Sequence, residues 1–194
     1  MKLEKMAFVR SGLVLGRKQA KDQTEYRYPL LNLRCVQPNG SVDTSLCETF
    51  RATEYLNPEY LTHEGDVVIR LTAPYTAVLI TRTLEGFVIP SSFIVVRTKT
   101  DILLPEYLVW LLNSQLSKRQ IYDGAATNML GGIKPRFFAE VDIDPLPTEQ
   151  QRAIAQLSAL AQQEAKLLRE LVAEKEKYYD LTINKIYNKM KRGN

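Results

Sequence analysis

The C-terminal segment of the chain contains no helix-breaking residue over an unusual length. Residues 149–190 include neither Gly nor Pro, and apolar side chains recur there every three or four positions, which is the spacing of one face of an α-helix. At 1.5 Å per residue such a helix extends over about 60 Å, which exceeds the width of the domain that precedes it. It cannot bury its apolar stripe against its own domain along its whole length, so the pattern predicts that it pairs with another helix.

The apolar stripe follows a heptad repeat, the pattern of helices that wrap around one another. Steps of three and four residues connect positions 154, 157, 161, 164, 168, 171, 175 and 178, with polar residues at Glu164 and Lys175. These two polar positions either fix the register of the pair or lie at the edge of an imperfect stripe. The residues expected to mediate dimerisation or partner docking are Ile154, Leu157, Ala161, Leu168, Leu171 and Tyr178.

The start of the long helix carries two local signals. Pro145-Leu-Pro147 ends the preceding structure. Thr148-Glu-Gln-Gln151 then fits a capping box, in which the Thr hydroxyl accepts from the backbone N–H three residues on and Gln151 reaches back. We therefore expect a globular domain at residues 1–147 and a long dimerisation helix at residues 148–194.

The globular domain shows the short apolar runs of β-strands, followed by a helical pattern. Pro105 stands where a helix begins, and apolar residues then recur at helical spacing to about Gln120. A polar, glycine-containing loop is expected from Asp123 to Ile133. The expected fold is α+β, with a curled mixed β-sheet and packed helices, followed by the long C-terminal coiled-coil helix. The expected strands are Leu30–Val36, Val67–Leu71, Ala77–Thr81, Phe93–Val96 and Phe137–Ile143.

Positive charge is concentrated near the N-terminal end. The formal net charge is +4, and residues 1–34 hold eight Lys or Arg against three Asp or Glu. Such segregation suits contact with a polyanion, although an ordinary solvated basic surface has the same composition. The chain lacks an apolar run of about 18 residues and the pattern of a signal peptide, so a cytoplasmic location is expected.

No residue pattern indicates catalysis or a metal site. Asn57-Pro-Glu-Tyr60 approaches the Asn-Pro-Pro-Tyr motif of adenine methyltransferases but departs at its third position, and no Gly-rich loop for S-adenosylmethionine precedes it, so a turn is expected there. His63 is the only histidine and is expected in a turn or on the surface. Cys35 and Cys47 have no neighbouring metal ligands, so two buried free thiols are expected. The sequence predicts neither an enzyme nor a bound cofactor or metal.

Several segments together resemble the specificity subunits of Type I restriction-modification systems. The strongest match is the run from Ile133 to Ile154, where a short strand leads into Pro-Leu-Pro and a Glu-Gln pair opens a long helix. Each segment is weak by itself, but their order and spacing are specific and cover nearly the whole chain. The supporting matches are Tyr28–Arg34 with Gly40–Asp43, Glu64–Ile69, Leu104–Leu112 and the loop Gly124–Gly132.

The resemblance implies a function and a set of partners. Members of that family carry two target-recognition domains, each followed by a long helix. This chain has one domain and one long helix and is therefore similar to a half subunit. A truncated gene product or a fragment would have the same sequence. Two copies are expected to pair their helices antiparallel and to read a palindrome split by an unread spacer in double-stranded DNA. Methylation subunits would dock on the helices and supply S-adenosylmethionine, and a restriction subunit would join for cleavage.

Contacts to bases and phosphates are expected from polar and basic side chains on loops at one face of the sheet. The candidates are Arg17, Lys18 and Lys21, then Arg70, Thr72 and Tyr75, and finally Thr127, Asn128, Lys134 and Arg136, with Arg27 and Arg82 as weaker choices. Gly65-Asp66 is interpreted as a turn that fixes strand direction. Trp110, at helical spacing among leucines, is interpreted as a core residue.

Two other classes of protein are alternatives. A homodimeric coiled-coil adaptor with a protein-binding head would have no DNA role. A degenerate methyltransferase fragment would have to bind S-adenosylmethionine, and the sequence offers no residues for that. A DNA reader differs from the adaptor in having an affinity for duplex DNA that falls as salt rises, because phosphate contacts release counterions.

Overall fold

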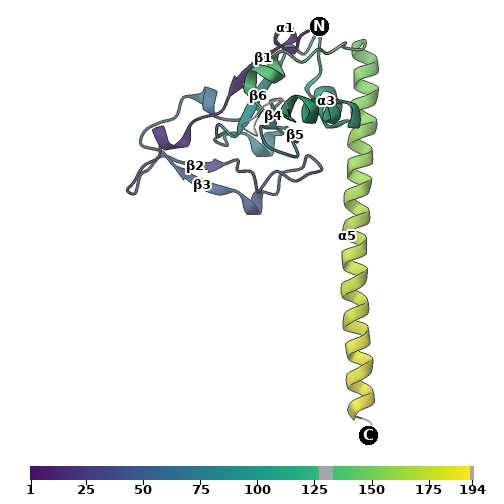
Figure 1. Ribbon diagram of the computed structural model, residues 1–194. Coiled ribbons are helices and arrows are strands. Elements are labelled where there is room, and N and C mark those ends of the chain that lie inside the picture. Colours follow the sequence, from purple (N-terminus) through teal and green to yellow (C-terminus); the bar gives the residue numbers. More distant parts are fainter. Residues whose placement is uncertain (127–132, 193–194) are drawn as a thin grey trace. The chain divides into compact units, whose positions relative to one another are not determined.

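The computed structural model describes residues 1–126 and 133–192, so the predicted contacts Thr127 and Asn128 lie outside the described residues. The chain forms two compact units, Met1–Ala155 and Gln156–Asn194, whose elements are drawn in Figure 1. Among the described residues, no helical segment combines the length and the hydropathy that a membrane span requires.

Four antiparallel strands form the central sheet of the first unit. Their order is β1 (Ala7–Ser11), β6 (Phe93–Thr98), β4 (Val67–Arg70) and β5 (Ala77–Leu79), so β1 and β5 are the edges. Val and Ile dominate the two central strands because both faces are covered. Val67 and Ile69 enter one apolar core, and Val68 between them enters another.

Helices cover one face of this sheet. The core on that face combines β-strand residues with Leu3 of α1 (Leu3–Met6), Leu108 of α2 (Pro105–Asn113), Ile121 of α3 (Gln115–Ala126) and Phe138 of α4 (Pro135–Ala139). Pro105 and Pro135 stand in the first turns of α2 and α4, where their missing N–H groups cost no hydrogen bond.

The last residue of α2 is bonded to the edge strand β5. The side-chain Oδ1 of Asn113 accepts from the backbone N–H of Ala77 at 3.0 Å, and its Nδ2 donates to the carbonyl of Ala77 at 2.7 Å. The helix therefore ends against the strand that it covers.

Segments 31–36 and 84–89 contribute to the core on the other face of the central sheet. A two-stranded antiparallel sheet adjoins them, formed by β2 (Arg27–Leu30) and β3 (Glu48–Arg51). An isolated bridge connects Leu30 with Val88, and Phe50 packs in a third apolar cluster together with Val88. Four short 3-10 turns lie in the connections: η1 (Leu15–Arg17), η2 (Thr44–Leu46), η3 (Pro58–Tyr60) and η4 (Arg82–Leu84).

A close backbone approach follows the end of β1. Leu13 N–H donates to the carbonyl of Ile89 at 2.6 Å, and Ser91 N–H donates to the carbonyl of Leu13 at 2.7 Å. A Cβ atom on Gly12 would lie 2.2 Å from the carbonyl oxygen of Pro90, which is far inside van der Waals contact. Only glycine fits at this position without moving the backbone.

The second unit is the body of α5 (Thr148–Arg192), which confirms the predicted long helix. Its seam residues Leu157, Leu168, Leu171 and Tyr178 are 51–69% exposed. Ile154 is different, because it belongs to the first unit and is partly buried against the core of that unit. The exposed part of the predicted stripe therefore begins at Leu157.

Gln151, near the start of α5, does not form the predicted capping box. It is 0% exposed, and its side-chain amide bonds three backbone groups of the first unit. Its Oε1 accepts from Leu104 N–H at 2.9 Å, while its Nε2 donates to the carbonyls of Ile102 at 2.9 Å and Leu146 at 2.7 Å. The carbonyl of Pro147 accepts the first helical bonds instead, from the N–H groups of Gln150 and Gln151.

The α+β class is confirmed, but the sheet is not mixed. All named strands pair antiparallel, and among the described residues parallel pairing occurs only in the isolated bridges Leu13–Pro90 and Leu30–Val88. The predicted strands Val67–Leu71 and Phe93–Val96 correspond to β4 and β6, and β5 is shorter than predicted.

Three other predictions were wrong in whole or in part. The strand predicted for Leu30–Val36 stops at Leu30, because the side chain of Asn32 accepts from the N–H groups of Arg34 and Cys35 and forms a turn. The segment Phe137–Ile143 begins within helix α4, and only its end is extended, where Asp142 forms an isolated antiparallel bridge with Lys2. The helix predicted to run from Pro105 to Gln120 breaks at Ser114, whose backbone is extended, and α3 then continues to Ala126 into the predicted loop.

Candidate nucleic-acid interface

The turn after β4 carries three predicted DNA contacts, and the structure gives them different roles. Thr72 is exposed. Arg70 donates from Nη1 to the carbonyl of Val36 at 3.4 Å and from Nη2 to the carbonyl of Ala73 at 3.2 Å, so it joins two loops. Tyr75 has a φ of 53° and is 5% exposed within the helix-side core. Thr72 is thus accessible on the surface, whereas Arg70 holds two loops together and Tyr75 is a core residue.

Lys118 of α3 holds the same turn. Its Nζ donates to the carbonyls of Pro74 at 2.7 Å and Tyr75 at 2.6 Å. Burial, and then the neighbouring charge of Arg70, lowers the pKa of Lys118 to about 8. Within residues 1–126 and 133–192, no carboxylate forms an ion pair with either cation. This excess of positive charge beside an exposed turn suits an anionic ligand such as a phosphate.

A hollow of about 490 Å³ lies next to this turn on the surface of α3. The sequence reasoning missed Lys118 and Arg119 because they occupy ordinary polar positions of a helix. Their adjacency in the sequence is the only signal that could have indicated them. The residues that line the hollow are Asn113, Gln115, Lys118, Arg119, Tyr122 and Asp123.

The basic N-terminal group lies beside β3. The backbone of Lys18 accepts from Thr53 N–H at 2.9 Å, and Ala20 N–H donates to the carbonyl of Arg51 at 2.9 Å. Arg17 and Lys21 are exposed, while Lys18 forms an ion pair with Glu54. This part of the fold therefore presents free cations as well as a paired one.

Two weaker candidates are also exposed. Arg27 lies opposite Arg51 in the β2–β3 register, so this small sheet carries two exposed cations at neighbouring positions. Arg82 is exposed in η4. The sequence reasoning missed Arg51, whose position depends on strand pairing.

The third predicted group lies at α4. Lys134 is exposed immediately before the helix, and Arg136 donates from Nε to the carboxylate of Glu140 at 2.6 Å. That hydrogen bond lowers the pKa of Glu140 and raises the pKa of Arg136. Helix α4 packs against α1 and β1. The group that contains Arg17 lies beside β3, and the group that contains Thr72 lies in the turn before β5. The structure thus places the three predicted groups in three different neighbourhoods.

A charged cluster at the start of β4 was interpreted from the sequence only as a turn. The turn is confirmed, since Gly65 has a φ of 84° and Asp66 N–H donates to the carbonyl of His63 at 3.0 Å. The carboxylate of Asp66 is also buried, and it accepts from Nε of Arg97 at 2.7 Å and from Nη2 at 3.1 Å. Nδ1 of His63 lies 2.5 Å from the same Nη2.

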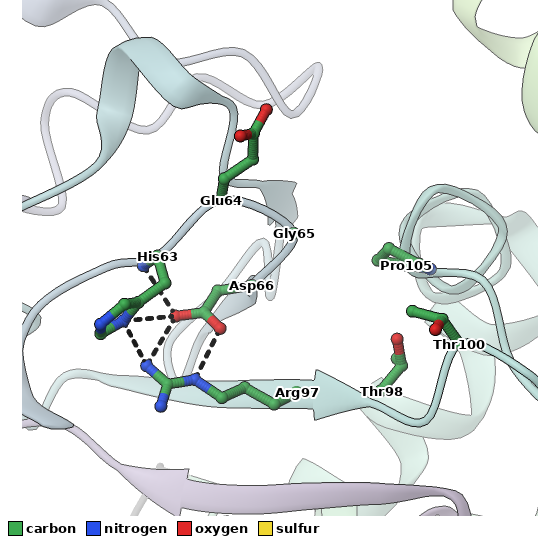
Figure 2. Close-up of a pocket in the computed structure, with 8 residues that line it drawn as sticks. All are labelled: His63, Glu64, Gly65, Asp66, Arg97, Thr98, Thr100 and Pro105. Carbon is green, nitrogen blue, oxygen red and sulfur yellow. Dashed lines mark hydrogen bonds and ion pairs between the residues drawn. The ribbon is translucent and has the colours of Figure 1, made fainter.

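Figure 2 shows the side chains of His63, Asp66 and Arg97 in mutual contact on one side of the pocket, with Thr98, Thr100 and Pro105 on the other side. The pocket has a volume of about 360 Å³. The partly exposed His63 is thus a turn histidine, as predicted, with its ring directed at a guanidinium. The cluster fixes the direction of Arg97 within this pocket.

The remaining sequence predictions concern residues outside these surfaces. Asn57 accepts from Glu59 N–H at 3.0 Å and opens η3, so the near-motif is a turn. Trp110 packs against the helix-side core, as predicted. Cys35 is buried, but Cys47 is only partly buried, and burial followed by a hydrogen bond with Cys35 raises the pKa of Cys47 to about 12. In the described part of the chain, no cluster of His, Cys, Asp and Glu is arranged to hold a metal ion.

The fold is similar to three solved chains of Type I restriction-modification systems. One comes from a study of complex assembly and conformational transition of such a system, with 19% identity, a TM-score of 0.64, and coverage of 91% of this chain and 45% of that chain. The HsdS subunit from Thermoanaerobacter tengcongensis has 18% identity, a TM-score of 0.66, and coverage of 93% and 46%. The S subunit from M. genitalium has 9% identity, a TM-score of 0.56, and coverage of 90% and 41%.

This chain therefore spans less than half the length of each of these neighbours. No protein-family model and no curated protein sequence matches it. The likeness concerns the fold: the α+β unit and the long helix are similar to part of the HsdS subunit and of the S subunit.

Proposed function

We propose that this chain, which has the fold of a Type I specificity subunit, recognises a DNA sequence and directs methylation and restriction subunits to it. The observation that supports the proposal most is the likeness to chains of such systems over 90–93% of this chain. In this proposal the chain selects the site, and its partners carry S-adenosylmethionine and perform the chemistry. The function proposed for this chain is therefore binding, without catalysis.

The first unit is proposed to contact the DNA through separate basic surfaces. The turn at Thr72 with Lys118, the group at Arg17 and Lys21, and the exposed Lys134 offer donors that suit phosphate oxygens and base edges. Contacts spread over several loops suit the reading of a duplex, because phosphate contacts fix the register while a few side chains reach the bases.

The second unit is proposed to assemble the complex. A single helix that exposes Leu157, Leu168 and Leu171 in water is unfavourable, since each buried leucine gains about 2 kcal/mol. Pairing with a second copy in antiparallel orientation would cover this stripe and present two recognition units with twofold symmetry. The DNA site expected for such a dimer is bipartite and palindromic.

The test combines light scattering with a methylation assay. The chain is measured at several concentrations, alone and with the methylation subunit of the same system and S-adenosylmethionine, and is then supplied with DNA of mixed sequence. The proposal expects a dimer that causes methylation of a split palindrome. A chain that neither binds the methylation subunit nor directs methylation contradicts it.

The coiled-coil adaptor makes the opposite prediction for DNA. It shares the exposed stripe of α5, so dimerisation alone does not separate the two functions. A labelled DNA duplex does, because the adaptor has no affinity that falls with increasing salt. A dimer without such affinity would favour the adaptor.

A further inference from the structure

Four residues that no predicted contact includes lie on one face at the β1 edge of the central sheet. Phe8 and Arg10 belong to β1, Arg97 belongs to β6, and Lys99 follows β6 directly. Phe8 lies opposite Arg97 in the register, and Arg10 is two positions further along β1, so the alternation of side chains places these residues on the same face. The Nζ of Lys99 lies 5.7 Å from the centre of the Phe8 ring. We call these four residues the β1 edge patch.

The aromatic ring of the patch has no role in the core. Its neighbours Ala7 and Val9 point to the opposite face and pack in or against the helix-side core, whereas Phe8 is 70% exposed. An exposed Phe among three cations gains little from its own fold. A ring in this place suits contact with an apolar part of a ligand, such as a sugar or a base.

The positive charge of the patch is only partly balanced. The buried carboxylate of Asp66 is committed to Arg97 through two hydrogen bonds. Arg10 has no such partner: its Nε and Nη2 are buried without a hydrogen-bond partner among the described residues. Burial, and then the neighbouring charge of Arg97, lowers the pKa of Arg10, while the charges of Asp66 and then Glu59 oppose this shift. Asp66 balances only one of the two guanidinium charges, so the pair keeps a positive charge that favours a further anion.

We propose that the β1 edge patch binds the phosphodiester backbone of DNA, with Arg10 and Arg97 on phosphate oxygens and Phe8 against the adjacent sugar. The inference rests on the proposed DNA function and adds a contact surface to it. A nucleic acid places an apolar sugar beside each phosphate, which matches an exposed ring beside two guanidinium groups. An acidic peptide would satisfy the cations but leave the ring without a partner. Asp66 and His63 position Arg97, so their role in binding is indirect.

Arg10→Gln in the full chain is the test variant, because Arg10 makes no hydrogen bond that folding requires. Binding is measured by fluorescence anisotropy with a labelled short duplex of mixed sequence at several salt concentrations. We expect the affinity at low salt to fall about three- to tenfold, and the slope of log K against log salt to become shallower by about 0.9, as for one lost phosphate contact. The thermal midpoint should stay the same or rise, because no partner is lost.

Arg169→Gln is the matched control, since it removes the same charge from an exposed position of α5 outside the heptad seam. Phe8→Ser should weaken binding without changing the salt slope, because it removes an apolar contact and no charge. Arg97 is unsuitable as a test, since its loss would leave the buried carboxylate of Asp66 without its paired cation.

The outcomes separate this inference from the proposed function. If the unmodified chain binds DNA with a salt-dependent affinity and Arg10→Gln behaves like Arg169→Gln, the patch is not a DNA contact, and the proposed function stands. If the unmodified chain shows no salt-dependent affinity, both fail. Binding to polyglutamate is measured in the same way for the unmodified chain and for Arg10→Gln. If Arg10→Gln weakens binding to polyglutamate as much as it weakens binding to DNA, the patch is a general anion surface, and the nucleic-acid assignment is overturned. An unchanged affinity in Phe8→Ser would overturn the role given to the ring.

Discussion

Replacing Gln151 tests how the globular unit holds the first turns of α5. The amide of Gln151 makes three buried hydrogen bonds, to the backbone groups of Ile102, Leu104 and Leu146. A hydrogen bond of this kind contributes about 1 kcal/mol net, so Gln151→Ala should lower the free energy of unfolding by about 3 kcal/mol, and by more if water does not reach the three groups.

Urea unfolding of the full chain, followed by the fluorescence of Trp110, measures this loss. Trp110 is the only tryptophan, and it packs against the core of the first unit. The protein concentration is held constant, because pairing of helices would raise the apparent stability. Gln150→Ala is the matched control: Gln150 is exposed, and its loss should change the stability by less than about 0.5 kcal/mol. A loss below about 1 kcal/mol in Gln151→Ala would refute the reasoning.

Gln151→Glu adds a dependence on pH with a definite sign. One carboxylate oxygen can still accept from Leu104 N–H, but the other would face the carbonyl oxygens of Ile102 and Leu146. Burial against these oxygens raises the pKa of the introduced carboxyl in the folded state. The folded variant then binds more protons than the unfolded chain, so its stability relative to the parent falls as the pH rises above about 4.3. Stability of the variant that does not change with pH would contradict this.

Three further predictions concern other parts of the chain. Burial lowers the pKa of Lys118 to about 8 from its ordinary 10.5, so the unfolded state binds more protons than the folded state between these pH values. The free energy of unfolding should therefore rise with pH over this range. In thermal melts at several pH values, Lys118→Met should lack this rise. Leu168→Glu should abolish the dimer in light scattering while Gln162→Glu, outside the heptad seam, should not; a dimer in both variants would contradict pairing through this stripe. Gly12→Ala places a Cβ 2.2 Å from a backbone oxygen of Pro90 and should lower the free energy of unfolding in urea by about 2 kcal/mol or more. An unchanged urea midpoint would show that the backbone moves aside at little cost.

Regular, repetitive patterns were predictable from the sequence. The long helix follows from 42 residues without Gly or Pro, and β4 and β6 follow from dense runs of Val and Ile. The segment from Phe137 was mistaken for a strand because its apolar residues alternate. Pro135 instead starts a helical turn that buries Phe138, and the choice between the two depends on the core into which Phe138 fits.

Side-chain roles that depend on distant partners were not predictable. Gln151 is three residues after a Thr, so a capping box is the local expectation, yet its partners Ile102 and Leu104 lie 49 and 47 residues away. Arg70 has the composition of a DNA contact, but it is used to hold Val36, which is 34 residues away. The β1 edge patch likewise exists only because β1 pairs with β6, which comes last in the chain among the strands of the central sheet.

The amide of Asn113 has a consequence for the outer side of β5. An edge strand offers free N–H and C=O groups to any other strand that meets it, which is a common route to aggregation. In this protein the outward N–H and C=O of Ala77 are both occupied by one side chain from α2, and β5 has only three residues. Asn113 therefore takes the place of a neighbouring strand and blocks the sheet from growing at that side, so that two copies meeting at high concentration are kept from joining through β5.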